Sequence, residues 1–91
     1  MHRLDYVDRA LRDARLTPGD RALLVRQGLQ AADTRLQEAP DDSETLALKG
    51  LLLRLLAGLE PDEGARERHL AEADRLRDQS IGARRRRLAG L

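Results

Sequence analysis

The chain contains two imidazole groups, His2 and His69, which have the chemistry to act as a base or to bind a metal ion. His69 and Glu72 stand three positions apart, so a helix would place both side chains on one face, where they would form half of a metal site. A di-metal carboxylate bundle needs Glu-x-x-His on two helices and further glutamates. In this chain the order is His before Glu, and the pair occurs once. We therefore expect no metal site, and we interpret His69 as a surface or helix-packing histidine.

Acid–base and nucleophilic chemistry has equally little support in the sequence. The acidic pairs Asp41-Asp42 and Asp62-Glu63 each stand beside a proline in the first turn of an expected helix, where the helix dipole favours negative charge. The glycines are isolated and form no phosphate-binding loop, and the chain has no cysteine to supply a thiolate. We therefore expect a protein that is not an enzyme, with no catalytic residues and no cofactor.

The strongest polar feature is a run of four arginines near the end of the sequence: Arg84, Arg85, Arg86 and Arg87. Residues 80–91 carry these four basic side chains and no acid, a net charge of +4, whereas residues 1–79 carry 13 basic and 16 acidic side chains, a net charge of −3. Adjacent guanidinium groups attract phosphate, so the arginine run is a candidate anion-binding site for nucleic acid. Tyr6 is the one aromatic residue, so the stacking side chains that support such binding are missing. The ordinary alternative is that the arginines stabilise the C-terminal end of a helix.

The composition indicates an all-α protein. The chain has no phenylalanine or tryptophan, few β-branched residues, and abundant leucine, alanine and arginine, which favour helices over strands. Its length suits one domain that buries roughly 60–65% of the surface of the unfolded chain. The first residues begin an amphipathic pattern and not the apolar pattern of a signal peptide. We therefore expect a cytoplasmic protein without membrane contact.

Three prolines divide the chain into segments with helical periodicity: Pro18, Pro40 and Pro61. Thr17 is placed to cap the helix that starts at Pro18, and Asp41 followed by Glu44 resembles a capping box for the next helix. The expected helices cover about residues 3–15, 18–38, 42–57 and 62–79. Because short connections make neighbouring helices antiparallel, we expect two αα-hairpins in one domain over residues 1–79. Residues 80–91 would form a basic helical tail or a capping helix.

Residues 46–56 are the most apolar part of the chain, with seven leucines in eleven positions. A helix with this pattern is apolar nearly all the way round and must be covered on several sides, yet it is too short to cross a membrane. The uncovered area would be buried by docking on another protein, or by self-association across a twofold interface through Leu51, Leu55 or Leu59. The alternative is that the four helices cover this central helix by themselves and leave a monomer without a groove.

The spacing of small and apolar residues over residues 20–79 resembles the tetratricopeptide repeat. In that family, a repeat begins after the proline that ends the previous repeat, a position that Pro40 matches. A large apolar residue is then followed by a glycine four positions later and by another large residue three positions further on, as in Leu46, Gly50 and Leu53. The resemblance implies a short helical solenoid, and a small four-helix bundle is the alternative packing.

In such a repeat, the first helix lines a concave face that takes an extended peptide or a partner helix. The resemblance places five residues of this chain on that face: Glu44, Ala47, Leu51, Arg54 and Leu55. We therefore predict a non-enzymatic protein–protein interaction module or scaffold that binds a protein or peptide and self-associates as a homodimer. The alternative prediction is a nucleic-acid-associated accessory protein that uses the arginine run.

Overall fold

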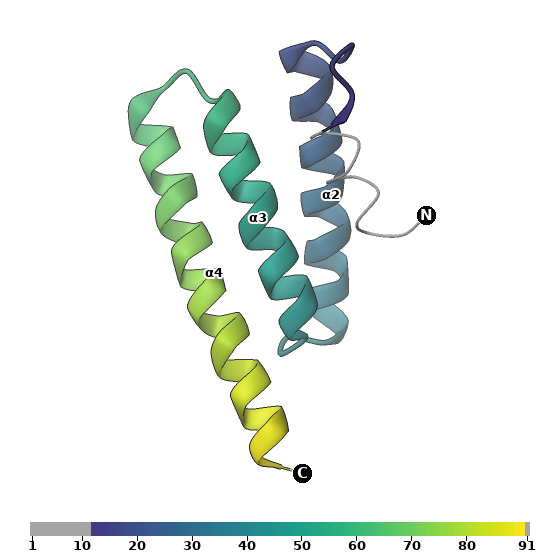
Figure 1. The fold of residues 1–91 in the computed structure, drawn as a ribbon, viewed down its shortest axis with the longest axis vertical. Coiled ribbons are helices and arrows are strands. Elements are labelled where there is room, and N and C mark those ends of the chain that lie inside the picture. The colour runs from purple at the N-terminus through teal and green to yellow at the C-terminus, as the bar shows by residue number, and fades with distance from the viewer. Residues whose placement is uncertain (1–11, 91) are drawn as a thin grey trace.

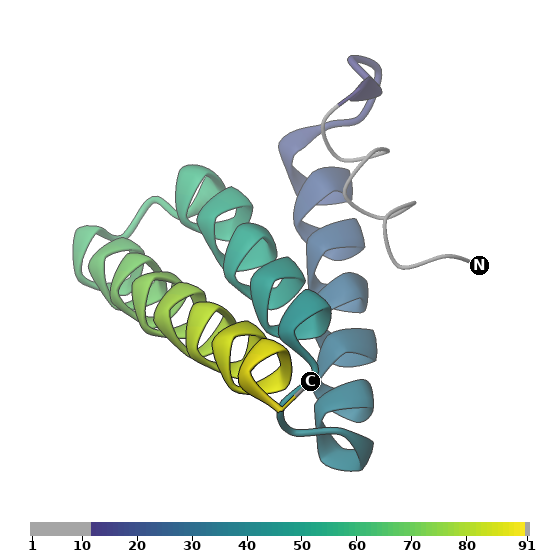
Figure 2. The same ribbon diagram turned by 60° about the horizontal axis from the view of Figure 1, so that its bottom comes forward.

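The computed structural model describes residues 12–90, and these residues form helices and turns without a strand. α2 spans Pro18–Glu38, α3 spans Ser43–Leu59 and α4 spans Glu63–Ala89. α3 lies between α2 and α4 and runs antiparallel to both (Figure 1). The second view shows the same order, with α2 and α4 on different sides of α3 (Figure 2). The all-α class predicted from the composition is therefore confirmed.

The predicted arrangement of four helices as two αα-hairpins is wrong. Residues 12–90 form three helices, and α3 packs against both of the others. The expected helix over residues 3–15 lies outside the described residues except for its end. At that end, Asp13 Oδ1 accepts a hydrogen bond from the Arg15 backbone N–H at 3.0 Å, and Ala14 is exposed. An aspartate that bonds to its own local backbone favours a turn over a continuing helix.

The predicted end of the last helix near residue 79 is also wrong, because α4 continues to Ala89. Ser80 and Gly82 are weak helix formers, yet both lie inside the helix. Ser80 is buried, its Oγ donates a hydrogen bond to the backbone carbonyl of Ser43 at 2.8 Å, and Ala83 is buried one turn further along. This packing against the start of α3 outweighs the weak helix propensities of serine and glycine. Residues 80–89 are therefore the C-terminal part of α4 and not a separate tail.

Local capping explains where α2 begins. Thr17 Oγ1 accepts a hydrogen bond from the Asp20 backbone N–H at 3.1 Å, and Asp20 Oδ2 accepts one from the Thr17 backbone N–H at 3.3 Å. This reciprocal pair is a capping box, and Pro18 occupies the first helical position, where its missing N–H costs nothing. For α3 the N-cap is Asp42 and not Asp41, so the capping box expected there is wrong.

The core is built from leucine and alanine on both sides of α3. One buried cluster joins α2 to α3: Val25, Leu48, Leu52 and Leu56. A second cluster joins α3 to α4: Leu46, Leu53, Ala73, Leu76 and Ala83. Leu29 of α2 packs against both clusters. Burial of each leucine side chain contributes about 1.5–3 kcal/mol, so α3 is the element on which the packing of the described helices depends.

Gly50 allows α3 and α4 to approach closely. A Cβ atom at this position would lie 3.3 Å from the backbone carbonyl oxygen of Ala73 on α4. The missing side chain therefore brings the two backbones nearer than a larger residue would permit. None of the helices within residues 12–90 combines the length and the apolar character needed to cross a lipid bilayer.

Candidate protein-interaction groove

A groove of about 460 Å³ runs between α3 and α4. Its floor consists of the buried residues Gly50, Ala73 and Ser80. The exposed residues along it come from both helices: Ala47, Leu51 and Arg54 on α3, and Arg77, Ile81, Arg84, Arg85 and Leu88 on α4. We call this surface the α3–α4 groove.

The groove lies on a side of α3 that is turned away from α2. Leu48, Leu52 and Leu56 contact α2, and each step along a helix turns the side chain by about 100°. The groove residues Ala47 and Leu51 precede Leu48 and Leu52 by one position and therefore lie on another face. The face of α3 that contacts α2 and the face that lines the groove are therefore different.

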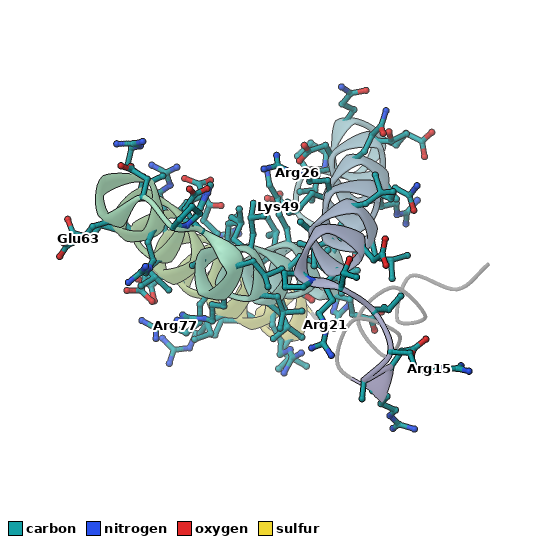
Figure 3. The ribbon with its side chains drawn as sticks, turned by 90° about the horizontal axis from the view of Figure 1, so that it is seen from above. Arg15, Arg21, Arg26, Lys49, Glu63 and Arg77 are labelled. Atoms are coloured by element: carbon teal, nitrogen blue, oxygen red, sulfur yellow. The ribbon has the colours of Figure 1, made fainter. Side chains whose placement is uncertain are left out.

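Lys49 and Arg77 extend from opposite faces of the hairpin formed by α3 and α4 (Figure 3). Lys49 extends toward the side where Arg26 of α2 lies, and its Nζ is 2.7 Å from Asp33 Oδ1 of α2. Arg77 extends on the other side of the hairpin formed by α3 and α4. One face of this hairpin is therefore covered by α2, and the other carries the groove.

Three large apolar side chains remain exposed along the groove. The exposed fraction is 41% for Leu51, 45% for Ile81 and 58% for Leu88. Leu70, at 38%, lies on the same line of α4 as Ile81 and Leu88, because separations of 11 and 18 residues are close to whole turns of a helix. Several exposed apolar side chains gathered on one groove mark an interaction site in many proteins, whereas single exposed leucines do not.

The floor of the groove presents no unpaired polar side chain. The Ser80 hydroxyl points back into the protein, where it donates its hydrogen bond to the Ser43 carbonyl at 2.8 Å. Gly50 and Ala73 have no polar side-chain atoms. The surface that a bound molecule would meet at the bottom of the groove is therefore apolar, and its polar groups are guanidinium groups along the edges.

The five predicted partner-binding residues do not form one surface. Ala47, Leu51 and Arg54 line the α3–α4 groove. Leu55 is half-buried and packs against the cluster between α2 and α3, and Glu44 is exposed in the first turn of α3, outside the groove. Because α3 is apolar on every side, its sequence has no clear period to separate Leu51 from Leu55.

The four predicted anion-binding arginines are divided between two places. Arg84 and Arg85 line the α3–α4 groove, whereas Arg86 and Arg87 lie beside Asp41 and Ser43 at the start of α3. There Arg86 forms an ion pair with Asp41 at 3.6 Å. Four consecutive helical residues are spread over about 300°, so the run does not present one cationic patch.

The charge along the groove is positive. Asp74 lies 2.7 Å from the Arg54 guanidinium and 3.9 Å from that of Arg77, and Asp78 lies 3.5 Å from the Arg77 guanidinium, so both of these arginines have a carboxylate partner. Within residues 12–90, Arg84 and Arg85 form no ion pair with a carboxylate. The edge contributed by the C-terminal part of α4 therefore carries two cations that no neighbouring carboxylate in this part of the chain neutralises.

The sequence did not predict that Arg77, Ile81 and Leu88 of α4 line this groove. The signal was present, since Ile81 and Leu88 stand seven positions apart on one helical face. It was overlooked because the helix was ended before residue 80.

The remaining candidate for chemistry, His69, lies at the opposite end of the hairpin. Its Nε2 is 3.9 Å from Glu60 Oε2, and it does not line the groove. In residues 12–90 there is no group of three or more His, Cys, Asp or Glu side chains arranged to hold a metal ion.

Comparison with known proteins gives no match to this chain among family models, curated proteins or solved structures. The resemblance to the tetratricopeptide repeat therefore stays a prediction.

Proposed function

We propose that the α3–α4 groove is a protein-binding surface and that this chain is a non-enzymatic interaction module of tetratricopeptide-like type. The observation that carries the proposal is the exposure of Leu51, Ile81 and Leu88 along one groove. Leaving these side chains in water forgoes roughly 25 cal/mol per Å² of apolar area, which a bound partner would recover. The binding partner is a helix of another protein or of a second copy.

The character of the groove supports a protein partner over a small molecule. Sites for small molecules are concave and combine apolar walls with a few converging polar groups that fix the orientation of the ligand. In the α3–α4 groove, the hydroxyl of Ser80 is already used within the protein, and the arginines stand along the edges. Apolar side chains projecting from a partner helix fit such a surface, with the arginines at its rim.

Nucleic-acid association through the arginine run draws no support from this geometry. Arg84 and Arg85 stand apart from Arg86 and Arg87, and Arg86 is paired with Asp41. Binding of nucleic acid depends on several cations tracking one phosphate backbone. The division of the run therefore favours the interaction module.

The test uses a fluorescent amphipathic peptide of about 20 residues, about 30 Å long as a helix, with leucines at alternating spacings of four and three and glutamine elsewhere. We expect the peptide to bind wild-type protein and to bind Ile81→Glu at least about tenfold more weakly, because a carboxylate would be placed in the apolar contact. Fluorescence anisotropy measures the dissociation constants.

Leu23→Glu is the matched control, because Leu23 is a 57% exposed leucine on α2, outside the groove. It should bind the peptide as wild type does. Absence of binding to wild type, or equal loss in both variants, would contradict the proposal. Circular dichroism confirms that both variants keep the helical content of the wild type.

A further inference from the structure

We infer that the α3–α4 groove binds an acidic amphipathic helix of a different protein, in preference to a second copy of this chain. This inference rests on the proposed function and adds the chemical class of the partner. It follows from three features of the described residues: the length of the apolar line on α4, the way α2 covers the other side of the hairpin, and the unbalanced positive charge along the groove.

The apolar line on α4 has the length of a helix contact. Leu70, Ile81 and Leu88 lie on one line of α4 that extends over 18 residues, or about 27 Å; Ile81 and Leu88 line the groove, Leu70 lies beyond it, and Arg77 stands between Leu70 and Ile81. Leu51 lies beside this line on α3, and the groove runs between the two helices. A partner helix of about five turns has this length.

The opposite side of α3 shows what kind of element fits. There α2 covers the hairpin with apolar residues spaced four and three positions apart: Val25, Leu29, Ala32 and Leu36. α2 exposes polar side chains on its other face and is linked to the hairpin at its edge by the Asp33–Lys49 ion pair. A partner helix of the same amphipathic type would extend the stack of helices by one layer.

The positive charge along the groove favours acidic residues beside the apolar stripe of the partner helix. Arg54 pairs with Asp74, and Arg77 pairs with Asp74 and Asp78, whereas Arg84 and Arg85 form no ion pair within residues 12–90. Among residues 12–90, no acidic side chain lines the groove. Glutamate or aspartate at the edges of the partner's apolar stripe would meet these guanidinium groups, and complementary charge sets partner choice and association rate.

The same charge opposes a second copy. In a twofold contact, each groove would face an identical groove, so the surface that carries Arg84 and Arg85, and that no acidic side chain of residues 12–90 lines, would meet a surface of the same charge. Like charges facing each other across an interface are unfavourable. The C-terminal part of α4, residues 80–89, carries four arginines and no acid with which to compensate.

The experiment compares two versions of the leucine peptide, with glutamate or with lysine beside the leucines. For wild-type protein we expect the glutamate peptide to bind at least about tenfold more tightly than the lysine peptide at an ionic strength of about 0.1 M, where exposed charges still interact. The double variant Arg84→Glu with Arg85→Glu should reverse this preference. The reversal is the decisive readout, because a variant that merely unfolds would lose both peptides.

Arg26→Glu with Arg68→Glu is the matched control, since both are exposed arginines outside the groove and the change in net charge is identical. It should keep the preference of the wild type. Equal affinity of the wild type for the two peptides would overturn the inference. If Ile81→Glu still weakened the binding of both peptides, the proposed function of the groove as a protein-binding surface would be retained. Light scattering that shows a stable dimer, lost in Ile81→Glu and kept in Leu23→Glu, would also overturn it in favour of a second copy.

Discussion

Gly50 and Gly58 lie on the same helix, eight residues apart, yet their surroundings differ completely. At Gly50 a Cβ atom would press on the Ala73 carbonyl oxygen at 3.3 Å, and at Gly58 it would meet nothing within 4 Å. Neither glycine has a positive φ angle, so backbone conformation does not require glycine at either position. Their different roles therefore depend on packing alone.

We expect Gly50→Ala to lower the free energy of unfolding by about 1 kcal/mol, because the strain of overpacking exceeds the gain in helix propensity. Gly58→Ala should raise it by about 0.5–1 kcal/mol, since alanine is a better helix former and fits without contact. Urea denaturation followed by circular dichroism measures both. A Gly50→Ala protein as stable as Gly58→Ala would show that the close approach of α3 and α4 has no energetic importance.

Among the elements, α2 has the start that is best defined by local chemistry. We expect Thr17→Ala to lower the free energy of unfolding by about 1 kcal/mol, because the substitution removes one half of the capping box with Asp20. Thr34→Ala is the control, since the Thr34 hydroxyl bonds to the Gln30 carbonyl within α2 at 3.1 Å and is exposed. Its effect should stay within about 0.5 kcal/mol of zero in the same urea titration. An equal loss in both variants would argue against the cap.

The elements also show which parts of the fold were accessible from the sequence. The start of α2 was predicted correctly because its signals, Thr17 and Pro18, are adjacent in the chain. The continuation of α4 was missed because part of its support comes from a contact distant in the sequence, the hydrogen bond from Ser80 to Ser43, 37 residues away. No local pattern encodes such a contact, and Ser80 and Gly82 themselves are weak helix formers.

The groove was predictable only in part for a related reason. Its α3 half, Ala47, Leu51 and Arg54, was placed by the resemblance to the tetratricopeptide repeat, but a helix rich in leucine on every side does not reveal which face α2 covers. Leu55 was therefore assigned to the wrong surface. The α4 half required the correct end of that helix before Ile81 and Leu88 could be placed beside Leu51.

For the whole molecule, the distribution of charge governs association with itself. The homodimer expected from the sequence stays a prediction, and the arginines of the groove oppose it. We expect that Arg84→Ser with Arg85→Ser raises the fraction of dimer at a given concentration, because neutral residues remove the repulsion and leave the apolar surface in place. Light scattering over a concentration series measures the mass of the particle.

The double variant Arg26→Ser with Arg68→Ser should leave the mass of the wild type unchanged, since these arginines lie outside the groove. An equal rise in mass for both double variants would indicate a general effect of lower net charge and not a contact through the groove.

The close contact at Gly50 and the Ser80–Ser43 hydrogen bond have a consequence for how a partner would bind. They fix α3 and α4 against each other before any partner arrives, so the groove is preorganised and little conformational entropy is lost on this side of a complex. The ordering cost would fall on the partner, above all if its acidic segment is disordered when free. Coupled folding of that kind lowers the affinity without sacrificing specificity, and it favours complexes that form and separate readily.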